Sequence, residues 1–130
     1  SVIHYEGIEQ KTYDLVKKHG MEKYIVYSSF WAESVKKMKE IDPACETGML
    51  AGRLSDCIKW GDYAKTDALH PDIGELDCEL PKRWQGKPVR AWNGIEKLYH
   101  NNNRTAKQDL REFALWGVTD IFTNVADKYL

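Results

Sequence analysis

The chain has 130 residues, of which 42% are hydrophobic and 30% charged, and its formal net charge is −1. These values are typical of one soluble globular domain that can bury a sizeable core. A net charge near zero gives no long-range field that would attract nucleic acid or an anionic membrane. No run approaches the roughly 18 apolar residues of a membrane span. The sequence opens at Ser1 with neither Met nor a basic leader, so we expect a processed or truncated product, soluble and of unknown compartment.

The N-terminal part predicts a helix, a strand and a second helix. Apolar residues recur at helical spacing over residues 8–18, and Gly20 suits the left-handed position after the helix. Residues 24–30, YIVYSSF, are aromatic and β-branched, which predicts a strand buried on both faces of a parallel sheet. From Trp31 the apolar spacing changes to three, and this second helix ends at Asp42 and Pro43.

The middle of the chain continues the alternation. Residues 46–50, ETGML, predict a short strand before the Ala51-Gly52 turn, and residues 54–64 predict a helix that contains Gly61. Ala68 and Leu69 predict a very short strand that stops at His70 and Pro71. Residues 73–84 form a mixed segment that Pro81 interrupts.

Residues 87–93, KPVRAWN, predict a strand of four or five residues that leads into a turn. Side chains alternate across a strand, so Arg90 and Trp92 share one face while Val89 and Ala91 share the other. In parallel α/β folds, ligands gather at the carboxyl ends of the strands. Trp92 therefore fits a pocket wall as well as a core.

The C-terminal part completes the pattern. Residues 96–103 are polar and predict a loop, Ala106, Leu110 and Phe113 mark a helix closed by Gly117, and residues 121–123 predict a last strand. Strands and helices that alternate in this way build a parallel sheet from right-handed βαβ units. The α/β fold class leaves two architectures open: part of a (β/α)₈ barrel, or a flavodoxin-like open sheet.

Neither the cysteines nor the histidines form a metal-binding motif. The cysteines are odd in number and contain no C-x-x-C pair, which argues against disulfides and a structural zinc site: Cys45, Cys57 and Cys78. The histidines are scattered: His4, His19, His70 and His100. His70 and Asp72 could offer two ligands to a metal, although a turn in which Asp72 acts as the capping residue is the commoner arrangement.

Several short motifs occur in the order seen in one enzyme family. They are SSF (residues 28–30), TGML (47–50), ALHP (68–71), VRAWN (89–93) and GVTDIFTN (117–124). In this order and spacing the chain resembles the C-terminal half of the glycerophosphodiester phosphodiesterase barrel, over nearly its whole length. The resemblance implies a single domain, residues 1–130, that forms strands four to eight of a TIM-type (β/α)₈ barrel.

The resemblance also implies what is missing from this chain. The family hydrolyses glycerophosphodiesters to glycerol phosphate and an alcohol, using a divalent metal (calcium or magnesium) held by carboxylates and two histidines as acid and base. Those residues lie in the family's N-terminal half, and we find none of them here. We therefore expect no catalytic residue, no metal ligand and no activity from this chain alone.

The resemblance implies that Trp92 and Phe30 line the substrate pocket, where they would stack on a glycerol-like group. If Trp92 faces inward, strand alternation places Arg90 on the same face, one layer deeper. An unpaired buried guanidinium is too costly, so a carboxylate must reach it. Within this chain Glu46 is the best candidate, and Gly48 would leave space for the pair. The alternative is that Glu46 lies in the loop before its strand and that a residue of the missing half-barrel meets Arg90.

Three hypotheses follow for the whole protein. The first is a pocket wall of a metal-dependent phosphodiesterase, completed by a missing N-terminal half-barrel. The second is a self-contained flavodoxin-like binding or interaction domain without catalysis, and the third is a half-barrel that pairs with a second copy. Residues 24–30 carry no charge, and an uncharged edge strand recruits a neighbour. This favours the hypotheses in which another strand pairs with the edge at residues 24–30.

Overall fold

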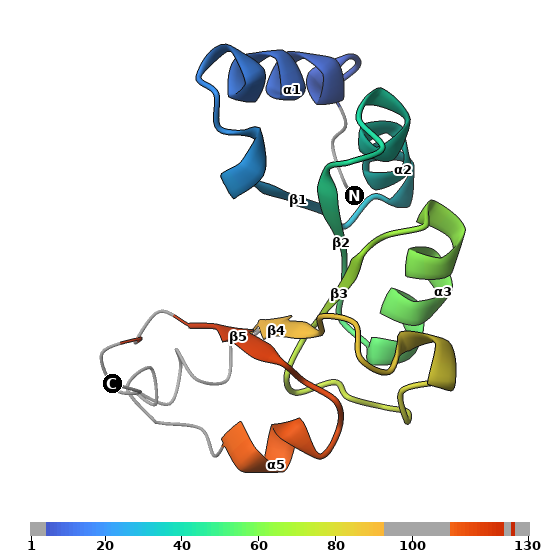
Figure 1. Cartoon of the computed structure of the whole chain (residues 1–130). Coiled ribbons are helices and arrows are strands. Elements are labelled where there is room, and N and C mark those ends of the chain that lie inside the picture. Colours follow the sequence, from blue (N-terminus) through green and yellow to red (C-terminus); the bar gives the residue numbers. More distant parts are fainter. Residues whose placement is uncertain (1–4, 93–109, 124–125, 127–130) are drawn as a thin grey trace.

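Parallel strands follow one another along the chain in a computed structural model that describes residues 5–92, 110–123 and 126 (Figure 1). The strands are β1 (Val26–Ser29), β2 (Glu46–Ala51), β3 (Ala68–Pro71), β4 (Arg90–Trp92) and β5 (Asp120–Phe122). β1, β2 and β3 pair in that order, and β4 pairs with β5. Parallel bridges from Leu69 to Val89 and from Asp72 to Trp92 join the two groups.

The sheet order follows the order of the sequence, from β1 to β5. A flavodoxin-like sheet instead places its second strand outside the first, in the order 2-1-3-4-5. The observed order β1-β2-β3 therefore argues against that alternative. Sequential parallel strands are the arrangement of an arc of a (β/α)₈ barrel.

The helices lie where the hydrophobic spacing predicts them. They are α1 (Ile8–Lys18), α2 (Ala32–Ile41), α3 (Leu54–Ala64) and the short α5 (Leu110–Ala114). Gly20 follows α1 with φ 63°, the left-handed conformation expected there. Short 3₁₀ helices cover Glu22–Tyr24 and Lys82–Trp84. Within the described ranges, none of the helices is long and apolar enough to cross a membrane.

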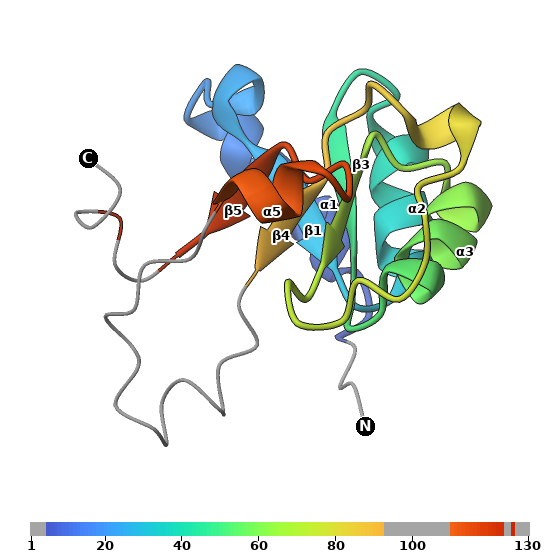
Figure 2. The same cartoon turned by 90° about the horizontal axis from the view of Figure 1, so that it is seen from below.

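α2 and α3 lie side by side on one face of the sheet, which we call the outer face (Figure 2). One buried cluster joins them to β2: Ala32, Val35, Met49 and Ala64. A larger cluster packs α3 and Trp84 against β3 and the start of β4: Leu54, Cys57, Ile58, Leu69, Trp84 and Val89. The main core of the described chain therefore lies on the outer face.

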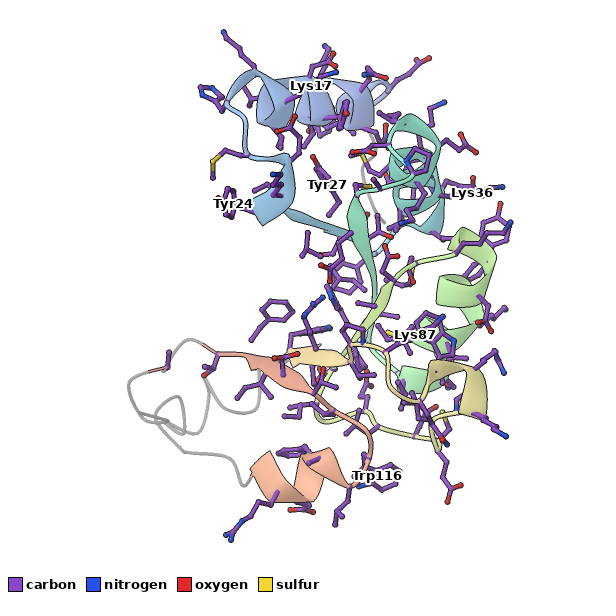
Figure 3. All side chains as sticks on the ribbon, in the orientation of Figure 1. Lys17, Tyr24, Tyr27, Lys36, Lys87 and Trp116 are labelled. Carbon is purple, nitrogen blue, oxygen red and sulfur yellow. The ribbon has the colours of Figure 1, made fainter. Side chains whose placement is uncertain are left out.

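The prediction for residues 24–30 is wrong in its burial. The strand begins at Val26, because Tyr24 belongs to a 3₁₀ helix, and its residues are alternately exposed and half-buried. Val26 is 40% exposed and Phe30 53% exposed. Among the described residues β1 pairs only with β2, so it is an edge strand. Helices cover one of its faces, where Tyr27 lies close to α1 (Figure 3), and leave the other open.

Smaller corrections concern the strand ends. β3 continues through His70 and Pro71, although the sequence predicts that it stops before them. β4 has three residues and β5 begins at Asp120, one residue before its predicted start. The predicted loop at residues 96–103 and the predicted helix start at Ala106 lie outside the described residues.

Candidate functional site

Alternate side chains of the strands point away from the helices and form what we call the inner face. Met49, Leu69 and Val89 are buried in the clusters with α2 and α3, so their neighbours along each strand point to the opposite side. The inner face carries Glu46 and Gly48 of β2, His70 of β3, Arg90 and Trp92 of β4, and Asp120 and Phe122 of β5.

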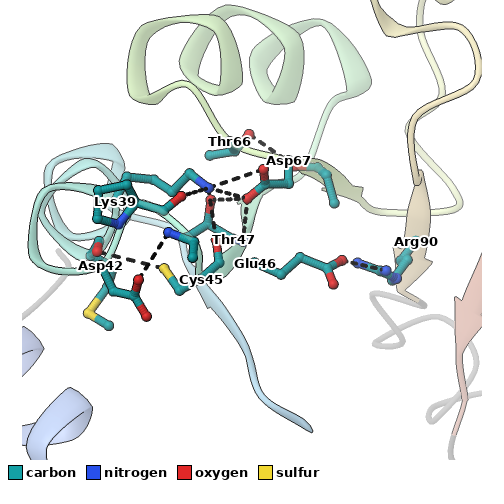
Figure 4. A network of polar contacts seen from close by, with 12 residues as sticks. Lys39, Asp42, Cys45, Glu46, Thr47, Thr66, Asp67 and Arg90 are labelled. Atoms are coloured by element: carbon teal, nitrogen blue, oxygen red, sulfur yellow. Dashed lines mark hydrogen bonds and ion pairs between the residues drawn. The ribbon is translucent and has the colours of Figure 1, made fainter. Parts of the chain in front are cut away.

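An ion pair on the inner face joins β4 to β2 (Figure 4). Arg90 Nη2 donates to Glu46 Oε1 at 2.6 Å, so the contact predicted from strand alternation is confirmed. The Arg90 side chain is 22% exposed and the Glu46 side chain 40%, which makes the pair half-buried and not deeply buried as predicted. Arg90 Nε also lies 3.9 Å from Asp120 Oδ2, a neighbour that the sequence did not predict.

The space above Gly48 holds the His70 imidazole and not the ion pair, so that part of the prediction is wrong. A Cβ atom at position 48 would overlap the His70 imidazole. On its other side, His70 meets the Phe122 ring in an edge-on arrangement with centroids 5.4 Å apart. Glycine at position 48 therefore lets a buried imidazole lie against β2.

His70 is 1% exposed, and neither of its ring nitrogens has a hydrogen-bond partner among the described residues. Burial, together with a smaller effect of the positive charge on Arg90, lowers the pKa of His70 to about 4. The imidazole is therefore neutral near pH 7, with one nitrogen able to donate and one able to accept. Arg90 Nη1 is also buried without a partner in the described part of the chain.

The two predicted pocket residues come from distant parts of the sequence and meet in space. The rings of Phe30 and Trp92 are perpendicular, with an interplanar angle of 88° and centroids 5.8 Å apart. Trp92 Nε1 donates to the carbonyl oxygen of His70 at 2.8 Å, which fixes the orientation of the indole. The structure brings the two rings together at the carboxyl end of the strands, and their role in substrate binding stays a prediction.

The described residues do not fit a metal ion. No group of three or more His, Cys, Asp or Glu side chains among them could hold one. The backbone N–H of Gly74 donates to Asp72 Oδ1 at 2.8 Å, so Asp72 acts in a turn, the commoner of its two arrangements. The three cysteines are free thiols, and burial raises the pKa of the Cys57 thiol to about 12.

A second polar network, which the sequence did not predict, holds the start of β2 (Figure 4). Lys39 Nζ of α2 donates to Asp67 Oδ2 at 2.9 Å and to the carbonyl oxygen of Cys45 at 2.8 Å. The backbone N–H of Thr47 donates to Asp67 Oδ2 at 2.8 Å. Burial alone would raise the pKa of Asp67, but the bonds from Lys39 and Thr47 outweigh it and lower that pKa. The network thus anchors Cys45 and Thr47, the residues on either side of Glu46.

The inner face as described is a set of binding groups. Aromatic rings stand at the carboxyl end, a neutral imidazole lies beneath them, and the Arg90–Glu46 ion pair lies beside the imidazole. Apolar ring faces suit the carbon skeleton of a small ligand, and neutral polar groups suit its hydroxyls. A paired general acid and base is not found among these side chains.

The comparisons with known proteins give a structural match without a sequence match. No protein family matches the sequence, and neither does any curated protein. A crystal structure of a protein from Galdieria sulphuraria, assigned as a glycerophosphodiester phosphodiesterase, is similar in fold, with a TM-score of 0.70 and 18% sequence identity. The match covers 97% of this chain and 50% of that protein, so the chain spans about half the length of its structural neighbour. The chain therefore has a parallel α/β fold related to part of a TIM-type barrel.

Proposed function

We propose that this chain is the pocket-wall part of a metal-dependent phosphodiesterase that acts on glycerophosphodiesters. It supplies Trp92 and Phe30 to the pocket, while the metal ligands and the acid and base come from an N-terminal half-barrel. The proposal rests on the open inner face, which bears the aromatic pair of Phe30 and Trp92. The fold of the chain matches half of a protein assigned to these phosphodiesterases.

The open inner face supports the need for a second half. In a closed barrel the inward side chains fill the interior. Here Val26, Phe30 and Phe122 are 40%, 53% and 49% exposed, although their strands are paired on at least one side. Large apolar side chains that stay exposed on one continuous face indicate a surface that another element covers.

The strand count favours a particular partner over a second copy of the chain. A (β/α)₈ barrel has eight strands, and the described residues contribute five, so three remain to be supplied. Two copies would bring ten strands together, which is more than the eight strands of this barrel. We therefore favour a three-stranded N-terminal segment, placed against the edge of β1, over self-association.

The test uses the chain joined to a segment that supplies the three remaining strands, encoded upstream in the same reading frame. The joined protein is expected to release glycerol phosphate from glycerophosphodiesters in the presence of calcium or magnesium. The 130-residue chain alone is expected to show no such release. In the joined protein, Trp92→Ala should raise KM about tenfold, since it removes one stacking wall.

Trp60→Ala is the matched control. Trp60 is also a half-exposed tryptophan, but it lies on α3 beside Tyr63, away from the inner face, so its loss should leave KM unchanged. Enzyme-like, metal-dependent turnover by the isolated chain would contradict the proposal. So would a joined protein that closes its barrel and binds no phosphodiester.

A further inference from the structure

We propose that His70, together with Nη1 of Arg90, binds a hydroxyl group of a small polyol ligand on the inner face. The proposal rests on the function proposed above and deepens it, since it names the part of the ligand that this chain recognises. It concerns a site below the aromatic pair, formed by β3 and β4.

The two groups are neighbours in the sheet. Leu69 pairs with Val89, so the next residues, His70 and Arg90, lie side by side on the inner face. His70 is 1% exposed, and neither ring nitrogen has a partner among the described residues. Nη2 of Arg90 donates a hydrogen bond to Glu46. Nη1 of Arg90 is buried and has no hydrogen-bond partner among the described residues. Buried polar atoms without partners are rare in native structures and call for a specific reason.

Charge decides which chemistry would satisfy these atoms. Arg90 already has two carboxylates, Glu46 at 2.6 Å and Asp120 at 3.9 Å, so a third negative charge would be repelled. A cation would be repelled by the positive charge of the Arg90 guanidinium. A neutral group that both donates and accepts suits a neutral imidazole and a guanidinium N–H, and a hydroxyl is the smallest such group.

The position of the pair suits a polyol. Trp92 is held above His70 by its bond to the His70 carbonyl, and Phe30 stands against Trp92. Because the two rings touch each other, a ligand would pack against the exposed side of the pair, and from there its carbon skeleton would direct a hydroxyl to the imidazole. The Phe122 ring, 5.4 Å from His70 and 49% exposed, covers the imidazole from the side of β5. A ligand therefore reaches His70 by displacing Phe122.

The experiment measures the His70 ring nitrogens and the Trp92 indole N–H by ¹H–¹⁵N NMR of the intact chain, during a titration with glycerol. We expect saturable shifts of the His70 nitrogens. Inorganic phosphate, which carries negative charge, should leave them unchanged. His70→Phe should weaken glycerol binding about tenfold, because it removes a hydrogen bond and keeps an aromatic ring.

Two further variants separate the causes. Phe122→Ala should strengthen glycerol binding roughly twofold to tenfold, the fold-change expected from loss of an edge-to-face ring contact that the ligand must otherwise break. His19→Gln, which changes an exposed histidine after α1, should leave binding unchanged.

The outcomes distinguish this proposal from the proposed function. Shifts of Trp92 without shifts of the His70 nitrogens would overturn the hydroxyl site and leave the aromatic wall in place. His70 nitrogens that are hydrogen-bonded in the free protein and indifferent to glycerol would mean an ordered water only, and would also overturn it. Equal effects of His70→Phe and His19→Gln would mean non-specific binding at high glycerol concentration, with the same consequence.

Discussion

The two faces of the sheet differ in how complete they are. On the outer face, Met49, Leu69 and Val89 are at most 1% exposed under α2 and α3. On the inner face, Phe30 and Phe122 are about half exposed, and buried polar atoms of His70 and Arg90 have no partner among the described residues. The outer face is a completed core, whereas the inner face has the composition of an interior that nothing in the described part of the chain covers. Stability thus comes from one face, and binding is expected on the other.

The largest expected effect tests which face stabilises the fold. Leu69→Ala should lower the free energy of unfolding by about 2–5 kcal/mol, because it leaves a cavity in the buried outer cluster. Phe30→Ala, which removes a larger but half-exposed side chain, should cost about 1 kcal/mol, mainly its contact with Trp92. Urea unfolding followed by circular dichroism measures both. A larger cost for Phe30→Ala would mean that the inner face is already a core.

Part of this comparison could be predicted from the sequence. Helical spacing predicted the bounds of α1 and α3, because apolar residues three and four apart fall on one face of a helix and on opposite or mixed faces of a strand. The contact between Glu46 and Arg90 followed from strand alternation and from the rule that alternate strands share a barrel layer. These are local or geometric rules that need no knowledge of the neighbours.

The rest depends on what covers each face, which a local pattern does not contain. YIVYSSF has the composition of a buried strand, yet β1 is an edge among the described strands and half of its residues are exposed. His70-Pro71 resembles a turn, but β3 continues through both residues, since proline at the last position disturbs the pairing only at its end. The only sequence feature that pointed to the buried position of His70 was Gly48. Gly48 was interpreted as leaving space for the Arg90–Glu46 pair, but His70 occupies that space.

The second expected effect concerns the charge state of the inner face. The unfolded chain takes up a proton on His70 near pH 6.5, whereas the folded protein does so only at about 4. Between these values the unfolded state binds more protons, so the free energy of unfolding falls as the pH falls, by about 3 kcal/mol in total. The charged groups that face His70 are Arg90 on β4 and Glu46 on β2.

The measurement is the urea midpoint between pH 7 and pH 4. His70→Phe should remove most of this pH dependence, because the substituted ring does not titrate. The lowered pKa values of Asp62, Asp67 and Asp77 act at lower pH, below their usual value of 3.8, and remain in the variant. A wild-type midpoint that is flat from pH 7 to pH 4 would show that the imidazole is solvated and not buried.

A third, smaller effect is expected from two glycines, Gly48 in the middle of β2 and Gly52 directly after it. In Gly48→Ala the new methyl group would meet the buried His70 ring, so the ring must move, at a cost of about 1–3 kcal/mol. In Gly52→Ala it would meet Glu75 Oε2, the tip of an exposed and flexible side chain, so the cost should be below about 1 kcal/mol. Thermal unfolding of both variants, compared with the wild type, tests the difference. Equal midpoints would mean that the inner face is loosely packed around His70.

The smallest expected effect is the coupling between Arg90 and Glu46, and it measures how far the inner face is withdrawn from water. A fully buried ion pair loses about 3–5 kcal/mol when one partner is removed, whereas an exposed pair contributes about 0.2–1 kcal/mol. With side chains 22% and 40% exposed, this pair lies between the two limits. Arg90→Met and Glu46→Gln, singly and together, should give a coupling energy of about 1 kcal/mol in urea unfolding.

The control cycle is Lys37→Met with Glu40→Gln, an exposed pair on α2 whose side chains are 58% and 56% exposed. Its coupling should stay below about 0.5 kcal/mol. If the missing half-barrel covers the inner face, repeating both cycles in the joined protein should raise the coupling of Arg90 and Glu46 toward the buried limit, because water leaves the pair. The α2 cycle should not change, since that helix lies on the finished outer side. An Arg90–Glu46 coupling that stays the same in both proteins would show that no partner covers this face.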